Sequence, residues 1–225
     1  MRMRIGLVLI AIVVVLVAGL LMMTRQPRKA SAAGGRVPAS PRFEKPKDTL
    51  FTDDFSSGLS DWKPDKDGVW EVERGVLRAR LPDEKQQRSF LRTGKPDWTD
   101  YAVDLDVCMT RGADKGVAVR VEGEEGVAVD LRGPAYHDVL LHRGMKRLGD
   151  AKVQNPNGEW HHIRLEVRGT RYVVFVNQKK LIEAEEFERK SGGIALAAYT
   201  GGAAKCTVYY DNVAVSKLEG DGKEH

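Results

Sequence analysis

The sequence lacks the short motifs of several large enzyme classes. It contains no Gly-rich phosphate loop, no Gly-x-Ser-x-Gly and no His-Glu-x-x-His, so nucleotide-dependent enzymes, serine hydrolases and zincins have no support. Only two of 225 residues are cysteine and five are histidine, and their spacing does not fit a zinc site. Beyond residue 48, apolar residues at helical spacing are nearly absent. The chain is therefore expected to be rich in strands.

A continuous basic surface is also missing. Residues 1–47 carry nine Lys or Arg and one Glu, which leaves 27 basic and 31 acidic residues for the rest of the chain. That remainder shows no stripe of Lys and Arg that could follow phosphates, so nucleic acid is not an expected partner. Hydrophobic residues make up 42% of the chain, enough for one sizeable core.

One long apolar run stands apart from this soluble composition. Ile5 to Met23 contains no polar residue, and 19 residues at about 1.5 Å each span about 28 Å, close to the thickness of a bilayer core. We predict that residues 1–24 form a signal-anchor transmembrane segment. A cleaved signal peptide ending near Ala30-Ser31-Ala32 is the alternative, although the run is longer than a usual signal core.

The chain after this run divides into three parts. Residues 25–48 are punctuated by proline and rich in Ala, Ser and Gly, which predicts a disordered linker. Residues 49–218 form the predicted globular domain, and residues 219–225 form a polar tail. Basic residues flank the apolar run almost equally, so its charges do not decide the orientation.

Alternation of apolar and polar residues dominates residues 49–218. In Tyr101 to Met109, every second residue is apolar, which is typical of a half-buried strand. The same pattern places Val117, Val119, Val127 and Val129 inward. About a dozen short strands separated by turn residues predict an all-β fold in which two antiparallel sheets pack face to face. Further strands are expected over 69–73, 76–81, 116–121, 126–132, 136–142, 160–168, 171–177, 180–184, 193–199 and 206–215.

Several segments together resemble a known superfamily. They are Phe51-Thr-Asp-Asp-Phe55 followed by Trp62, Val69-Trp-Glu-Val-Glu-Arg-Gly-Val-Leu77, Trp98-Thr-Asp-Tyr101, Gly116-Val-Ala-Val-Arg120, Gly158-Glu-Trp-His-His-Ile-Arg-Leu165, Val176-Asn177, Gly192-Gly-Ile-Ala-Leu196 and Tyr210-Asp-Asn-Val-Ala-Val215. In their order and spacing, these segments are similar to the concanavalin-A-like lectin/glucanase superfamily, and within it to laminin-G-like and 3-keto-disaccharide-hydrolase-like domains. The resemblance implies an antiparallel jelly-roll β-sandwich, often with a concave face that binds carbohydrate, usually outside the cytoplasm.

The resemblance does not decide between binding and catalysis. Family 16 glycosidases of this superfamily carry Glu-x-Asp-x-Glu on one strand, and here the nearest segment is Asp104-Leu-Asp106, with Cys108 at the third position. Solvated acids on a strand face explain these residues equally well. No catalytic residue is therefore assigned.

Five polar residues on three consecutive predicted strands form the candidate ligand site. Arg120, Asp130, Arg132, Tyr136 and His142 are all predicted to point outward, and neighbouring strands lie about 4.8 Å apart. Guanidinium, carboxylate, phenol and imidazole groups are suited to hydrogen-bonding sugar hydroxyls. The alternative is a cross-strand ion pair between Arg120 and Asp130 on a solvated face, which needs no ligand.

A calcium ion is a further candidate ligand. Asp53 or Asp54 near the start of the domain and Asp211 with Asn212 near its end become neighbours if the two end strands pair, as in the resembled fold. Oxygen ligands suit calcium, so Asp54 and Asp211 are the candidate metal residues. The alternative is that these side chains cap turns. Adjacent His161 and His162 point to opposite faces of a strand and cannot share one ion.

Cys108 and Cys206 form the candidate disulfide. In an oxidising compartment an even pair of cysteines can bridge, and this bridge would close a loop of about 98 residues. It requires Cα atoms within about 7 Å of each other. The strand pattern places the two side chains on different faces, so two unpaired thiols remain the alternative.

The combined prediction is a single-pass membrane protein that displays a carbohydrate-recognition domain outside the cytoplasm, with a glycan or polysaccharide as partner. A glycoside hydrolase of the 3-keto-disaccharide type is the first alternative, and a protein-interaction scaffold of the cell envelope is the second. Trp62, Trp98 and Trp160 could stack on sugar rings, although at least two of the three are expected to be structural.

Overall fold

The computed structural model describes residues 39, 41, 46–133 and 136–218. The predicted transmembrane segment, most of the predicted linker and the polar tail lie outside the described residues, and their predictions are untested. Among the described residues, no helix has the length and apolarity needed to cross a membrane.

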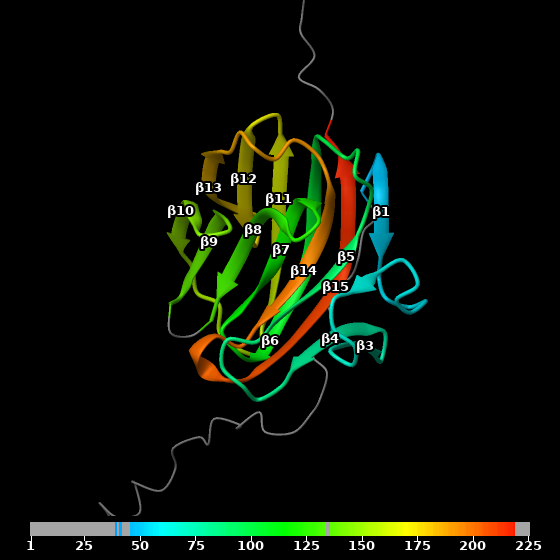
Figure 1. The fold of residues 1–225 in the computed structure, drawn as a ribbon, viewed down its shortest axis with the longest axis vertical. Coiled ribbons are helices and arrows are strands. Elements are labelled where there is room, and N and C mark those ends of the chain that lie inside the picture. The colour runs from blue at the N-terminus through cyan, green and yellow to red at the C-terminus, as the bar shows by residue number, and fades with distance from the viewer. Residues whose placement is uncertain (1–38, 40, 42–45, 134–135, 219–225) are drawn as a thin grey trace, which may run out of the picture. The chain divides into compact units, whose positions relative to one another are not determined.

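The described chain is a sandwich of two antiparallel sheets, which confirms the predicted all-β fold (Figure 1). One sheet has eight strands in the order β13-β12-β11-β6-β15-β4-β3, with β1 also paired to β15. The other has seven strands in the order β10-β9-β8-β7-β14-β5-β2. A 3₁₀ turn, Gly201–Ala203, precedes β15.

The strands of the eight-stranded sheet are β1 (Thr49–Asp53), β3 (Trp70–Glu73), β4 (Val76–Leu81), β6 (Tyr101–Arg111), β11 (Trp160–Arg168), β12 (Arg171–Val176), β13 (Lys179–Glu185) and β15 (Cys206–Lys217). Those of the seven-stranded sheet are β2 (Lys63–Pro64), β5 (Arg88–Thr93), β7 (Asp114–Glu122), β8 (Glu125–Arg132), β9 (Asp138–Arg143), β10 (Lys146–Lys152) and β14 (Gly193–Tyr199).

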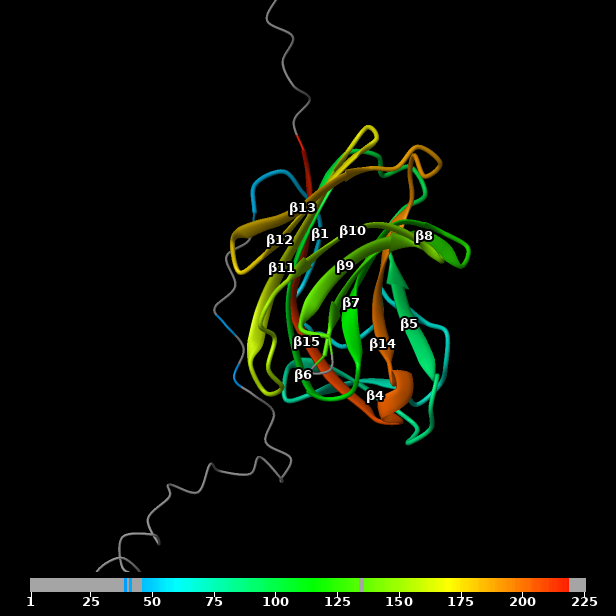
Figure 2. The same cartoon turned by 90° about the vertical axis from the view of Figure 1, so that its left-hand side faces the viewer.

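Alternate side chains from the two sheets fill the space between them. The valines predicted to point inward, Val117, Val119, Val127 and Val129, have no exposed surface. Figure 2 shows the sandwich from its side, with the eight-stranded sheet on the left and the seven-stranded sheet on the right. Each sheet therefore keeps one face for the core and one for solvent, as the period-2 pattern predicts.

Two buried tyrosines of the eight-stranded sheet join it to the backbone of the other sheet. The Tyr210 hydroxyl accepts a hydrogen bond from the Gly116 amide at 2.9 Å and also contacts the Ala197 carbonyl. The Tyr101 hydroxyl accepts from the Arg120 amide at 2.7 Å and lies 3.1 Å from the Gly192 carbonyl. Burial raises the pKa of both phenols, so both hydroxyls keep their protons and can donate across the core.

Arg120 is not on the outer face, and its predicted place in the ligand site is wrong. The strand pairing of β7 shifts register between Val119 and Glu122, and Arg120 takes a positive φ of 50° at this bulge. The extra residue turns Arg120 inward, where only 2% of its surface is exposed. Val121, predicted inward, instead lines a surface depression.

The buried guanidinium of Arg120 joins several loops at one end of the sandwich. It donates to the carbonyl of Thr99 at 2.9 and 3.1 Å, of Gly169 at 2.6 Å and of Arg189 at 2.7 Å. Its Cζ atom lies 5.5 Å from the centre of the Tyr172 ring. Backbone carbonyls thus satisfy most of its donors, as a buried cation requires.

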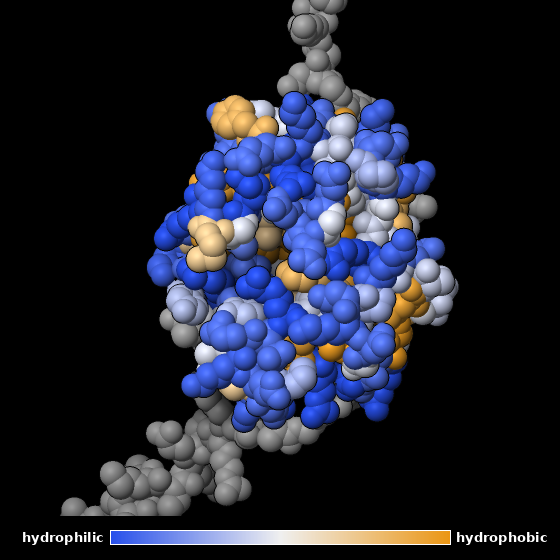
Figure 3. Space-filling view, in the orientation of Figure 1, coloured by the Kyte–Doolittle hydropathy of each residue, from blue (hydrophilic) through white to orange (hydrophobic). Residues whose placement is uncertain are grey.

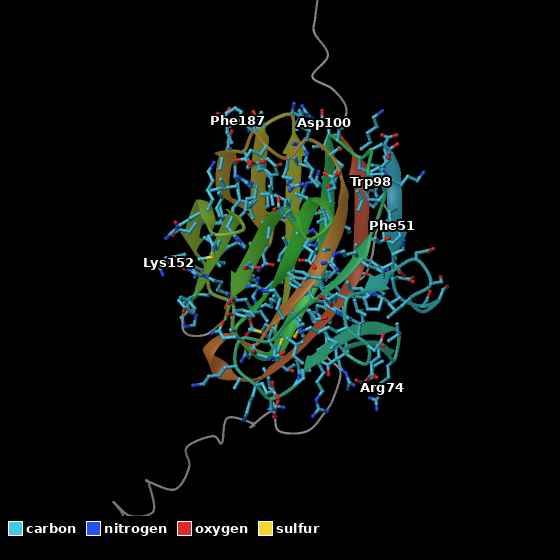
Figure 4. The ribbon with its side chains drawn as sticks, in the orientation of Figure 1. Phe51, Arg74, Trp98, Asp100, Lys152 and Phe187 are labelled. Atoms are coloured by element: carbon cyan, nitrogen blue, oxygen red, sulfur yellow. The ribbon has the colours of Figure 1, made fainter. Side chains whose placement is uncertain are left out.

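An ion pair with Asp100, at 3.3 Å, completes this cluster. Figure 4 labels Asp100 and Phe187 at the same end of the molecule, where these loops gather. The ion pair between Arg120 and Asp130, which was the alternative to a ligand site, is not formed either, because the bulge separates their faces.

The two cysteines are free thiols, so the candidate disulfide is not formed. Cys206 belongs to the main core, whereas Cys108 packs with Val76, Tyr209 and Trp160 on the opposite side of the eight-stranded sheet. Side chains on opposite faces cannot reach each other across the backbone. Burial raises the pKa of Cys108 to about 11 and that of Cys206 to about 12, so both remain protonated thiols at neutral pH.

We predict that Arg120→Ala lowers the free energy of unfolding by about 3–5 kcal/mol, because it leaves the carbonyls of Thr99, Gly169 and Arg189 without their donor. Arg120→Lys keeps the charge but not the planar set of donors, so it should restore little of the loss. Urea unfolding measures both variants, and Arg74→Ala in the exposed β3–β4 turn is the matched control. A loss in Arg120→Ala no larger than that of the control would contradict this role.

Candidate functional site

A groove crosses the outer face of the seven-stranded sheet, and we call it the sheet groove. It encloses about 870 Å³, including space open to solvent. Small residues from three central strands make its floor: Ala118, Gly126, Ala128 and Ala197. Because the floor side chains are short, the longer side chains on either side form raised walls. Figure 3 shows this face of the molecule, with mostly hydrophilic surface around small apolar areas near its centre.

The first wall combines aromatic rings with an arginine. Arg88 and Phe90 come from β5, and Tyr199 from the end of β14. The Cζ atom of Arg88 lies 4.8 Å from the centre of the Tyr199 ring and 6.0 Å from that of Phe90. Stacked rings and guanidinium groups offer both a flat apolar surface and in-plane donors.

The second wall carries a hydrogen-bonded pair, Asp130 and His142. The Nε2 atom of His142 lies 2.9 Å from a carboxylate oxygen of Asp130, and its Nδ1 atom lies 2.8 Å from the carbonyl of Gly144. Both partners are acceptors, so this geometry favours the doubly protonated ring. Burial lowers the pKa of His142, but the hydrogen bond and charge of Asp130 outweigh it and leave this pKa raised.

Asp114 lies at one end of the groove, on the first residue of β7. It pairs in register with Arg132 of β8, which places it diagonally across from Asp130 on the same face. Its Oδ1 atom is buried and has no hydrogen-bond donor among the described residues. Burial, and then the charge of Asp130, raise the pKa of Asp114 to about 7. A carboxyl group in this state can take up or release a proton near neutral pH.

Of the five predicted ligand residues, only Asp130 and His142 line the sheet groove. Arg132 forms a two-pronged ion pair with Asp138, with both N–O distances at 2.7 Å, and its Cζ atom lies 4.3 Å from the centre of the exposed Tyr136 ring. Arg132 and Tyr136 therefore lie side by side. Arg132 contacts the Tyr136 ring and the Asp138 carboxylate, and neither Arg132 nor Tyr136 lines the groove.

Sequence reasoning missed four of the groove residues: Arg88, Phe90, Asp114 and Tyr199. The strand Arg88–Thr93 was not predicted, because its inward residues include Ser89 whereas Phe90 points outward. Asp114 lay outside the strand predicted from Gly116. Its position two residues before that strand, on the face of Asp130, is the one signal that could have found it.

The outer face of the eight-stranded sheet holds a second cluster of charges. His162 lies 3.1 Å from Asp104 and 2.9 Å from Asp106, and these hydrogen bonds raise the pKa of His162 to about 9. Arg164 also pairs with Asp104. His161 is buried on the other face, as predicted for adjacent strand residues. These groups satisfy one another and leave the sheet groove as the better candidate site.

The residues predicted to bind calcium lie on or beside two paired strands and already have hydrogen-bond partners. Strands β1 and β15 pair, with Asp53 opposite Val213, as the resemblance implied. Asp54 accepts a hydrogen bond from the Ser56 amide at 3.0 Å, and Asp211 accepts one from the Asn212 amide at 2.8 Å. Within the described part of the chain, no group of three His, Cys, Asp or Glu residues could hold a metal ion. The Asp54 carboxylate caps the turn after β1, and the Asp211 carboxylate accepts a hydrogen bond from the adjacent amide within β15.

The tryptophans are mainly structural. Trp62 and Trp98 belong to the main core, and Trp62 donates to Asp53 at 2.7 Å. Trp160 is half-buried beside Cys108. None of the three lines the sheet groove, so the expectation that at least two are structural is confirmed.

The sequence of this domain matches a family model. The model describes the 3-keto-alpha-glucoside-1,2-lyase-like domain, and the match extends over residues 49–216. The chain belongs to this family. No curated protein matches the chain in sequence. Family membership agrees with the predicted concanavalin-A-like resemblance. The matched residues belong to both sheets.

Solved structures of similar fold include several sugar-related proteins. The carbohydrate-binding module CBM66 from Bacillus subtilis has a TM-score of 0.61 at 14% identity, covering 71% of this chain and 97% of its own. The exoplasmic domain of VIP36, solved with Ca²⁺ and Man3GlcNAc, has a TM-score of 0.59 at 12% identity. The match covers 74% of this chain and 87% of the VIP36 chain. A protein from Parabacteroides distasonis that is described as a glycosyl hydrolase has a TM-score of 0.52 at 20% identity. The match covers 74% of this chain and 98% of that protein's chain. At these identities the likeness establishes the fold.

We predict that Asp114 makes the protein less stable as pH rises. The pKa of this carboxyl is raised from its usual value near 4 to about 7, so its contribution is fully present below pH 4 and is lost as pH rises through about 7. Asp114→Asn cannot ionise and should raise the melting temperature at pH 8 by a few degrees, with little effect at pH 4. Melting curves at both pH values check this, with exposed Asp67→Asn as control. Equal shifts for both variants would contradict it.

Proposed function

We propose that the sheet groove binds a glycan. The single observation that carries this proposal is the arrangement of its walls: stacked Arg88, Phe90 and Tyr199 face the Asp130–His142 pair across a floor of small residues. Sugar rings present apolar C–H faces to aromatic groups and hydroxyl edges to charged polar groups. A narrow floor between two such walls accommodates a flat ring.

Two further observations support a sugar ligand. The family is described by a glucoside-cleaving activity, and several proteins of similar fold carry sugar-related names. The groove and the charged cluster of His162 lie on the outer faces of different sheets. The polar groups of the groove therefore form no hydrogen bonds with that cluster.

Filling the groove should abolish glycan binding without disturbing the core. Ala128→Trp puts a large side chain on the floor, and Lys179→Trp is the control at an exposed position on β13 of the other sheet. We expect the unmodified chain and the Lys179→Trp variant to bind the same members of a glycan array, and the Ala128→Trp variant to lose them. Equal binding by all three would exclude the groove as the site.

A second candidate function, cleavage of a 3-keto glycoside, is favoured by Asp114. This carboxyl group has one buried oxygen without a donor and a pKa raised to about 7, in the same groove as a protonated histidine. Proton transfer at neutral pH needs groups of this kind.

The chemistry follows from the carbonyl at C3 of such a substrate, which makes the hydrogen on C2 acidic. Ionised Asp114 takes that proton, and the electron pair of the C2–H bond becomes the C1–C2 double bond. The C1–O bond breaks, its electron pair goes to the leaving oxygen, and His142 supplies the proton that this oxygen takes. Asp130 holds His142 in its protonated form for this step.

Asp114→Asn separates the two functions. With a nitrophenyl 3-keto α-glucoside, we expect nitrophenol release by the unmodified chain and a loss of about 10²–10⁴-fold in kcat/KM for Asp114→Asn. Glycan binding by the same variant should persist. Release that is unchanged in Asp114→Asn would exclude Asp114 as the base, and binding without release by either chain would leave recognition as the function.

Other predictions stay as proposals. They are attachment to the membrane through residues 1–24, placement of the domain outside the cytoplasm, and calcium at Asp54 and Asp211. The VIP36 domain has been solved both with Ca²⁺ and in a metal-free form.

A further inference from the structure

A row of basic side chains follows one long edge of the sheet groove and a neighbouring depression on the same sheet. It consists of Arg88 and Arg92 on β5, Lys63 on β2 and Lys95 after β5. We call these four residues the basic rim. None of them has an ion-pair partner among the described residues. Arg88 and Arg92 are four residues apart on one strand, so the rim extends over about 13 Å.

On the opposite side of the groove, the arginines form ion pairs with carboxylates of the protein. Arg143 pairs with buried Glu186 at 3.1 Å and also with Glu188, and Arg189 pairs with Glu125 and, at 3.4 Å, with Glu122. Each arginine on that side is therefore neutralised by the protein itself. Asp61 and Glu122 also line the depression beside the rim, but neither pairs with a rim residue. The two edges of the groove consequently differ in charge available to a ligand.

Aromatic stacking holds the rim guanidinium groups in place. The Cζ atom of Arg92 lies 5.3 Å from the centre of the Phe90 ring, on which Arg88 also packs at 6.0 Å. The buried Nε atom of Arg92 has no acceptor in the described chain. Stacking fixes the plane of a guanidinium and leaves its N–H groups free to pair with a carboxylate.

Lys63 and Arg92 are opposed in a way that protein stability alone disfavours. They are direct partners in the antiparallel pairing of β2 with β5, and both line the depression. Like charges at directly opposite positions repel each other and destabilise a strand pair. An anion bound between them would remove that repulsion.

We propose that the ligand of the sheet groove is an anionic glycan, whose uronate carboxylates lie along the basic rim. This inference rests on the proposed glycan binding and adds the class of glycan to it. The length of the rim fits an oligomer better than a single sugar, because two separate guanidinium groups then each meet a carboxylate.

The test compares oligogalacturonate with its methyl ester, which has the same sugars without the charges. With the full chain at low salt, calorimetry should show at least tenfold tighter binding of the acid form, and 0.5 M NaCl should reduce this preference. The double variant Lys63→Gln, Arg92→Gln should bind the acid form at least tenfold more weakly. The control Arg74→Gln, Lys179→Gln removes two exposed charges elsewhere and should not change binding.

Lys63→Glu distinguishes a functional rim from a structural one. It replaces the repulsion with an attractive cross-strand pair, so it should raise the melting temperature while weakening binding of oligogalacturonate. Equal binding of acid and ester, or no effect of the rim variants, would overturn the anionic class while leaving glycan binding intact. If neutral glycans of an array bind and oligogalacturonate does not, the anionic class is likewise wrong. If no glycan of either kind binds, the proposed function itself fails.

Discussion

The arrangement of both sheets depends on a small network of buried hydrogen bonds centred on Tyr101 and Arg120. The Tyr101 hydroxyl accepts from the Arg120 amide, while the Arg120 guanidinium donates to carbonyls in three separate loops. A buried arginine is tolerated only where its donors are satisfied. The bulge in β7 that turns Arg120 inward is therefore coupled to the positions of these loops, one of which carries Arg189 to the edge of the groove. Tyr210 has a matching role beneath the floor, where it contacts the backbone of Gly116 and Ala197.

The parts of the fold that follow alternation were predictable from the sequence, and the parts that break alternation were not. Val117, Val119, Val127 and Val129 lie where a period of two puts them, and the pairing of β1 with β15 agrees with the resemblance. Arg120 departs from the prediction because one extra residue in a strand reverses the faces beyond it. Nothing in the residue types near Arg120 distinguishes that bulge from a regular strand.

The candidate site was only half predictable for a related reason. Asp130 and His142 are polar residues in regular strands, and they point outward as expected. Phe90 and Tyr199 are large aromatic residues that a pattern of hydrophobicity assigns to a core, yet here they form a wall of the groove. An aromatic residue on an outer face becomes informative only when the residues beside it are known. The raised pKa of Asp114 likewise depends on burial and on the charge of Asp130, which come from different strands.

The two sides of the groove hold their arginines in different ways. On the β8 and β9 side, Arg132 and Arg143 form ion pairs with carboxylates. On the β5 side, stacking on Phe90 and Tyr199 replaces ion pairing as the means of holding arginines. A ligand with several polar groups would thus meet fixed acceptors and donors on one edge and unmatched positive charge on the other, which orients it across the groove.

The hydrogen bond from Asn212 to the carbonyl of Pro41, at 2.9 Å, has a consequence for access. Asn212 also donates to Asp106, so Pro41 is fastened at the back of the sandwich, on the sheet that does not carry the groove. Pro41 itself therefore lies on the sheet opposite the small-residue floor. A polymer lying lengthwise in the groove would not meet Pro41.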